Sequence, residues 1–211
     1  MAVAVAILAA GRGSRLRVGR RLAKPAVEIH GRPLVRWAAD AALESGLAPV
    51  FVVVGQRARR VARAVPPGVT VVKARDWSRG IAHSLGAAIA FVEADPSVDA
   101  LCVGLADQPL IGSDAYRRLA AAHGAGAELA VATYDGQRTN PVLLGRSLWS
   151  EARALRGDVG ARALMDTHEV VEVDCTGTGD PVDVDTLEDL RTIERSTAWN
   201  DRLWKDRDAD H

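Results

Sequence analysis

The sequence predicts an α/β fold: a doubly wound, mostly parallel sheet with helices on both faces. Short apolar runs alternate with segments of helical spacing along the chain, and this alternation is typical of parallel sheets. With 48% hydrophobic residues among 211, the chain can bury a substantial core. No Pro- or Ser-rich linker divides it, so we expect a single domain over residues 1–195 and a charged tail over residues 196–211.

The predicted strands are short apolar runs rich in β-branched residues. Residues 2–8 (Ala-Val-Ala-Val-Ala-Ile-Leu) are apolar at every position, as expected for a parallel strand that is buried on both faces. The same argument applies to the later runs. In chain order, the predicted strands are residues 2–8, 50–54, 69–72, 100–105, 128–133, 141–144 and 170–173.

The predicted helices lie between these runs. Pro33 stands in a first turn and Gly46 at a stop, with apolar residues at helical spacing between them. Residues 56–64 form a basic segment, and residues 80–92 are rich in alanine, a strong helix former. In chain order, the predicted helices are residues 33–45, 56–64, 80–92, 114–123, 147–155, 160–166 and 186–195.

Charge and composition exclude several classes of protein. The 27 basic and 27 acidic residues balance, which gives no electrostatic reason to expect nucleic acid or an anionic membrane as partner. Residues 1–10 are apolar without a preceding basic stretch, so we expect neither a signal peptide nor a membrane span. Cys102 and Cys175 have no metal-ligand or redox spacing, which fits a reducing, cytoplasmic compartment.

The loop after the first predicted strand is the strongest local signal. Residues 8–16 read Leu-Ala-Ala-Gly-Arg-Gly-Ser-Arg-Leu, and Lys24, one of three lysines in the chain, follows. Small residues at this place let backbone N–H groups approach a phosphate, and Arg15 and Lys24 would supply positive charge. The alternative is a flexible basic loop of the kind that any α/β protein can carry.

Two acidic segments follow much later in the chain. Asp107 ends a predicted buried strand, where a carboxylate could hold Mg²⁺ together with substrate phosphates or simply cap a helix or turn. Asp183 and Asp185 point the same way in an extended chain, and Asp185 or Thr186 could cap the last helix. If the fold brings the segments together, we expect Asp107 and Asp183 to share the ion and Asp185 to serve the turn.

Three further segments carry weaker signals. Residues 80–85 (Gly-Ile-Ala-His-Ser-Leu) open a predicted helix, and a helix N-terminus with small residues suits a base or a phosphate. Residues 138–141 and 156–162 are predicted to be turn-rich loops. Their residues alone indicate no particular chemistry.

Taken in order, these segments resemble the MobA-like nucleotidyltransferase family, most closely its molybdenum cofactor cytidylyltransferase branch. The resemblance covers about residues 5–190. The sequence departs from the branch at two positions. Asn140 precedes the proline where the branch has a histidine, and Leu187 stands where the branch has a proline. The matching motifs lie at residues 8–16, 24–34, 80–85, 107–109, 139–141, 157–162 and 183–190.

The resemblance implies a Rossmann-like nucleotidyltransferase fold and a specific reaction. A nucleoside monophosphate would pass from a nucleoside triphosphate to a phosphorylated acceptor of the molybdopterin type, and pyrophosphate would be released. The resemblance favours CTP as the donor of CMP, because Ala10 stands where guanylyl enzymes tend to have glycine. Mg²⁺ would be the cofactor, and a molybdoenzyme could receive the product. The alternatives are a guanylyltransferase of the same family, a non-enzymatic molybdenum cofactor maturation or delivery factor, and a sugar-nucleotide pyrophosphorylase.

The resemblance also implies roles for individual residues. Arg15 and Lys24 would be catalytic. The nucleotide would contact Leu8, Ala9, Ala10, Gly11, Gly13, Lys24, Gly80 and Ser84. The metal would be held by Asp107, Asp183 and Asp185. The acceptor would contact Asn140, Asp158 and Arg162.

Overall fold

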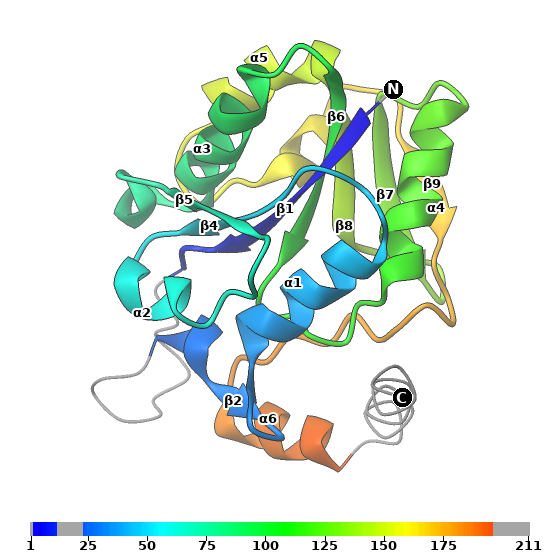
Figure 1. The fold of residues 1–211 in the computed structure, drawn as a ribbon. Helices are drawn as coiled ribbons and strands as arrows, with labels where there is room; N and C mark the ends of the chain where they lie inside the picture. The colour runs from blue at the N-terminus through cyan, green and yellow to red at the C-terminus, as the bar shows by residue number, and fades with distance from the viewer. Residues whose placement is uncertain (1, 12–22, 196–211) are drawn as a thin grey trace.

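The computed structural model describes residues 2–11 and 23–195 (Figure 1). Two predicted site residues, Gly13 and Arg15, lie outside the described residues, as does the predicted tail.

The described residues form a seven-stranded sheet with the order β5-β4-β1-β6-β8-β7-β9. All neighbouring strands run parallel except β8, which is antiparallel to both β6 and β7. The predicted fold class is confirmed. The strands are β1 (Ala2–Ala9), β4 (Val50–Val54), β5 (Thr70–Lys73), β6 (Val98–Leu105), β7 (Leu129–Tyr134), β8 (Gln137–Gly145) and β9 (Val171–Asp174).

Helices cover both faces of this sheet. On β1, Val5 and Ile7 belong to one core cluster, and Ala6 to another, because successive side chains of a strand point to opposite faces. Helices α1 and α4 pack on the first face, and α3 and α5 pack on the second (Figure 1). The α-helices are α1 (Leu34–Glu44), α2 (Ala58–Ala62), α3 (Ile81–Glu93), α4 (Ser113–Gly124), α5 (Trp149–Ala154) and α6 (Leu187–Glu194).

Short 3₁₀ turns complete the helical part of the structure. Residues 160–166, predicted as a helix, form only a 3₁₀ segment, η4 (Ala161–Asp166). The other such turns are η1 (Lys24–Ala26), η2 (Trp77–Arg79) and η3 (Arg146–Leu148). Within residues 2–11 and 23–195, no helix has both the length and the apolar character needed to cross a membrane.

The hairpin of β7 and β8 corrects the prediction for residues 138–141. These residues were expected to form a loop, but they belong to the nine-residue strand β8, in which Arg138 and Thr139 pair with β7 and Asn140 and Pro141 lie at a shift of the register. Asp135 and Gly136 both have positive φ, 49° and 75°, which is the backbone of the two-residue turn that joins twisted antiparallel strands. Asn140 therefore lies on a strand.

A third core cluster lies at one end of the sheet and holds α6 in place. Here α6 packs beside the small hairpin of β2 (Glu28–Ile29) and β3 (Arg32–Pro33) (Figure 1). Ile29, Trp37, Val184 and Ile193 are buried in this cluster. The chain just before α6 is thereby fixed close to the segment that contains Lys24.

Candidate active site

The strands that carry the predicted site residues end together. Leu8 of β1 pairs with Val53 of β4 and with Leu105 of β6. The loops that follow these three strands therefore emerge along one edge of the sheet. In open α/β sheets, ligands bind at this edge, outside the carboxyl ends of the strands.

The segment before α6 runs beside the end of β6. The N–H of Val184 donates to the carbonyl oxygen of Asp107 at 2.9 Å, and the N–H of Gly112 donates to that of Thr178 at 3.0 Å. These bonds join parts of the chain that are far apart in sequence. They place the acidic residues on either side of Val184 at the end of β6, as the shared-site prediction requires.

Gln108 is a site-supporting residue that the sequence prediction did not include. Its side chain is 2% exposed, and its Nε2 donates to the carbonyl oxygen of Pro181 at 3.0 Å and to Thr139 Oγ1 at 3.5 Å. It thus joins the end of β6 to β8 and to the segment before α6. A buried amide between Asp107 and a proline is the only sequence signal for this role.

Lys24 is the central charged group of the site. It is 9% exposed, and its Nζ donates to Asp107 Oδ2 and to Asp185 Oδ1, each at 2.6 Å. A buried ammonium is tolerated only when it is paired in this way. Burial alone lowers the pKa of Lys24, but the charges and hydrogen bonds of Asp107 and Asp185 outweigh burial and raise it above its usual value. Lys24 is therefore a fixed cation.

The contact of Asp185 with Lys24 corrects one expectation. Asp185 was expected to serve the turn into the last helix, but its side chain is engaged by Lys24. Thr186 caps α6 instead: its side chain accepts from the N–H of Asp189, and the Asp189 carboxylate accepts from the N–H of Thr186. This reciprocal arrangement satisfies two donors at the start of the helix.

Asp183 belongs to the same charged group. Partial burial raises the pKa of Asp183, and the Asp107 and Asp185 carboxylates raise it further, whereas Lys24 and Arg162 oppose them. The predicted acceptor residue Arg162 therefore faces this group of acids. Among the described residues, no group of three or more His, Cys, Asp or Glu side chains forms a ready metal cage.

A cleft of about 510 Å³ lies next to this charged group. It contains most of the residues predicted to contact the nucleotide, together with Asp107. Ala9, also predicted, is buried within β1 and does not line the cleft. The lining residues are Leu8, Ala10, Gly11, Trp77, Ser78, Arg79, Gly80, Ile81, Ser84, Leu105, Asp107 and Asp158.

Gly80 determines how the start of α3 is covered. Its φ is +116°, and a Cβ at this position would lie 2.1 Å from the carbonyl carbon and oxygen of Gly157. The N–H of Ala82 donates to that same oxygen at 3.2 Å. The loop that contains Gly157 crosses the start of α3 and places Asp158 in the cleft. Asp158 was predicted to contact the acceptor, but it lies among the residues predicted to contact the nucleotide. Asn140 is half-buried on β8 and does not line the cleft.

Trp77 and Leu105 line the cleft but were not among the predicted site residues. Trp77 is half-buried in η2, directly before Gly80, and Leu105 is the last residue of β6. Trp77 lies three residues before Gly80, and Leu105 lies two residues before Asp107. A large apolar residue beside a glycine-opened helix is the signal that would have indicated Trp77.

Comparison with known proteins identifies one family over most of the chain. The family described as MobA-like NTP transferase domain matches residues 5–173. Bifunctional protein GlmU of Pelobacter propionicus is 36% identical over 158 residues, which are 73% of this chain and 33% of that protein. GlmU of Pelotomaculum thermopropionicum is 35% identical over 138 residues, 64% of this chain and 29% of that protein. The chain spans about a third of the length of these curated relatives.

Solved structures share the fold. Rv0371c from Mycobacterium tuberculosis H37Rv has a TM-score of 0.81 and 29% identity, over 93% of this chain and 98% of that one. The same protein in complex with manganese gives 0.78 and 26%, over 93% and 100%. Molybdopterin-guanine dinucleotide biosynthesis protein A from Archaeoglobus fulgidus gives 0.67 and 15%, over 90% and 96%, a likeness of fold alone.

Proposed function

We propose, since the chain belongs to the MobA-like NTP transferase family, that it transfers CMP from CTP to a phosphorylated acceptor of the molybdopterin type and releases pyrophosphate. The observation that carries this proposal is Lys24, fixed between Asp107 and Asp185 beside a cleft of about 510 Å³. That volume lies in the usual range for small-molecule sites, about 300–1,000 Å³.

The proposed reaction is a direct in-line displacement. An oxygen of the acceptor phosphate attacks the α-phosphorus of the nucleotide, the bond to the β-phosphate oxygen breaks, and pyrophosphate leaves. No covalent enzyme intermediate is needed, so the protein contributes position and charge. Lys24 remains protonated because its pKa is raised, and it donates hydrogen bonds to phosphate oxygens rather than accepting a proton.

We assign the residues that line the cleft to different parts of the nucleotide. Ala10 and Gly11, at the end of β1, offer a small-residue backbone to the triphosphate. Gly80 and Ser84 at the start of α3 would face the base or the ribose. Asp158 lines the same cleft, so we assign it to the nucleotide rather than to the acceptor. Arg15 and Gly13, in the segment between Gly11 and Lys24, are proposed to complete the phosphate site.

The acidic residues fit a divalent cation. The carboxylates of Asp107, Asp183 and Asp185 lie close enough to influence one another's charge, and they do so together with Lys24 and Arg162. Mg²⁺ is usually held by one or two carboxylates together with substrate phosphates, so a three-residue cage is not required. When bound, the ion would neutralise charge on the phosphates. The manganese complex of Rv0371c, a similar protein, supports this assignment.

Arg162 and Asn140 are the residues that we consider for binding the acceptor. Arg162 faces Asp183 and would contact the acceptor phosphate beside the metal. Asn140 keeps the acceptor role only if the acceptor extends toward β8. Molybdopterin as acceptor, and a molybdoenzyme as the recipient of the product, are supported by the motif at residues 157–162 and by the segment at residues 183–190.

Pyrophosphate release measures this proposal directly. Purified protein is incubated with each nucleoside triphosphate, Mg²⁺ and molybdopterin, and kcat/KM is compared between nucleotides. We expect CTP to be preferred over GTP, and Asp107→Asn to lower turnover by about 10³-fold because the metal and Lys24 both lose a carboxylate. Faster turnover with GTP would identify guanylyl transfer. Binding of molybdopterin without turnover of any nucleotide would favour the delivery factor.

A further inference from the structure

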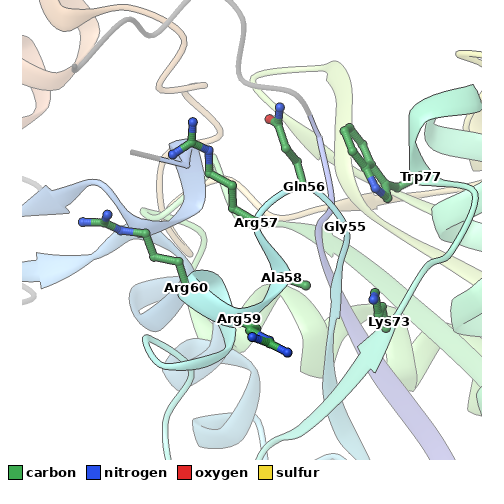
Figure 2. Close-up of a pocket in the computed structure, with 8 residues that line it drawn as sticks. All are labelled: Gly55, Gln56, Arg57, Ala58, Arg59, Arg60, Lys73 and Trp77. Carbon is green, nitrogen blue, oxygen red and sulfur yellow. The ribbon is translucent and has the colours of Figure 1, made fainter. Parts of the chain in front are cut away.

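A second hollow of about 600 Å³ opens on the same edge of the sheet, beyond Trp77 (Figure 2). Gly55 directly follows β4, and Lys73 is the last residue of β5, so this hollow also lies at the carboxyl ends of parallel strands, where such sheets bind ligands. We call it the basic hollow. Its cations are Arg57, Arg59, Arg60 and Lys73.

The charge of the basic hollow is strongly one-sided. Residues 45–75 contain six Lys or Arg and no Asp or Glu, although the 27 basic and 27 acidic residues of the whole chain balance. The hollow has four cations and no carboxylate in its lining. Arg59 and Lys73 are exposed and form no ion pair with any residue in the described ranges. An anion in the hollow would be attracted to both of these exposed charges.

One wall of the basic hollow is formed by Trp77, which packs closely against Gly55. Lys73 is paired in register with Val54, the residue before Gly55. A Cβ on Gly55 would lie 2.6 Å from the Cβ of Trp77 and 2.8 Å from that of Ala10. Only glycine therefore allows the indole to sit against the end of β4. Trp77 lines both this hollow and the nucleotide cleft.

We propose that the basic hollow is a second anion-binding site, which takes the phosphate or polyphosphate group of a small molecule. An open hollow with two exposed cations, Arg59 and Lys73, and one aromatic wall suits the phosphate chain of a small molecule. An extended acidic protein segment is the alternative occupant, and a polyglutamate peptide is its probe in the titrations. The site does not depend on the proposed transfer reaction.

Figure 2 indicates which cations to test first. Lys73 lies on the side of Trp77, whereas Arg57 and Arg60 extend to the opposite side of the segment that leads into α2. Lys73 and Arg59 are therefore chosen, since both are exposed and neither has an ion-pair partner among residues 2–11 and 23–195. Replacement by glutamine removes the charge and retains a polar side chain.

Calorimetric titration with inorganic tripolyphosphate at low salt tests the proposal. We expect two equivalents to bind to the unaltered protein, one in the nucleotide cleft and one in the basic hollow. Lys73→Gln or Arg59→Gln alone should weaken one equivalent by up to about fivefold, as expected for one exposed charge. The double variant should lose that equivalent. Arg191→Gln, which removes an exposed charge from α6, should retain both.

A complementary variant separates this proposal from the proposed function. Lys24→Gln should lose the cleft equivalent and retain the one that depends on Lys73 and Arg59. If no nucleotide is turned over but this second equivalent persists, the transfer reaction fails and the basic hollow stands. Titration with CTP in place of tripolyphosphate tells whether the hollow accepts the phosphate chain of a nucleotide or only a free polyphosphate.

Three results would overturn the second site. One is a single equivalent in the unaltered protein that Lys24→Gln removes and the double variant retains. Another is a pair of equivalents that the double variant leaves unchanged while its circular dichroism matches that of the unaltered protein. The third is tighter binding of a polyglutamate peptide than of tripolyphosphate through the same two residues, since it would identify a docking surface for an acidic segment.

Discussion

Two groups of cations stand on the same edge of the sheet, and they differ in what surrounds them. Lys24 is 9% exposed and is held by two carboxylates at 2.6 Å. Lys73 and Arg59, in the basic hollow, are exposed and have no carboxylate in the lining around them. The first group has its geometry fixed before any ligand arrives, whereas the second has only an excess of charge.

This difference predicts how each group responds to substitution. A buried, paired charge is costly to disturb, because the partner left behind keeps its desolvation penalty. An exposed charge is screened by water and salt, and its contribution is small and nearly additive. We therefore expect directional catalysis at the Lys24 end of the edge and general attraction of anions at the Lys73 end.

The largest expected effect is on catalysis at Lys24. Lys24→Ala removes a fixed cation that contacts both Asp107 and Asp185, and the loss of one such charge typically lowers the rate by about 10²–10³-fold. Steady-state pyrophosphate release with CTP checks this expectation. Arg191→Ala, an exposed charge on α6, is the control and should change the rate by less than about twofold. Equal losses in both variants would break the comparison between fixed and screened charge.

Much of the fold could be predicted because the central strands are buried on both faces. In β1 and β4, nearly every side chain belongs to the core, so the apolar runs alone indicate them. The first half of β8 could not be predicted in this way, because Gln137 and Arg138 are exposed and polar. The Asp135-Gly136 pair before them is itself a signal for a hairpin turn. It indicates that β8 begins directly after Gly136.

The site could be predicted only where local motifs contain it. Lys24 and Asp107 lie in short segments with a recognisable pattern. The pairing of Lys24 with Asp185 depends on backbone bonds between segments far apart in sequence, such as that from Val184 to Asp107, and no local pattern records them. The same is true of Asp158, which reaches the cleft only because its loop crosses the start of α3.

A smaller effect concerns stability at the same lysine. Lys24→Met removes the charge and leaves Asp107 and Asp185 close together without their shared partner, which should cost about 2 kcal/mol of unfolding free energy. Adding Asp107→Asn to this variant should restore part of that loss. The matched substitution Arg59→Met, at an exposed position, should cost less than about 0.5 kcal/mol. Urea denaturation measures all three variants, and an equal cost at both positions would contradict the distinction drawn above.

The smallest expected effect is at Asp183 and has the opposite sign. Its raised pKa shows that burial and the nearby Asp107 and Asp185 carboxylates disfavour the charged form, so Asp183→Asn should stabilise the protein in the absence of divalent cations. Solvent screening limits the gain to about 0.5 kcal/mol. Asp166→Asn, at an exposed position in η4, should show no gain.

The sign of the effect at Asp183 is also sensitive to the proposed metal. If Asp183 helps to hold Mg²⁺, then adding Mg²⁺ should raise the melting temperature of the unaltered protein more than that of Asp183→Asn, because a ligand that binds only the folded state stabilises it. The gain of the variant should then shrink or reverse as Mg²⁺ is titrated. An advantage for Asp183→Asn that is the same at every Mg²⁺ concentration would remove Asp183 from the metal site and leave Asp107 and Asp185 as its candidates.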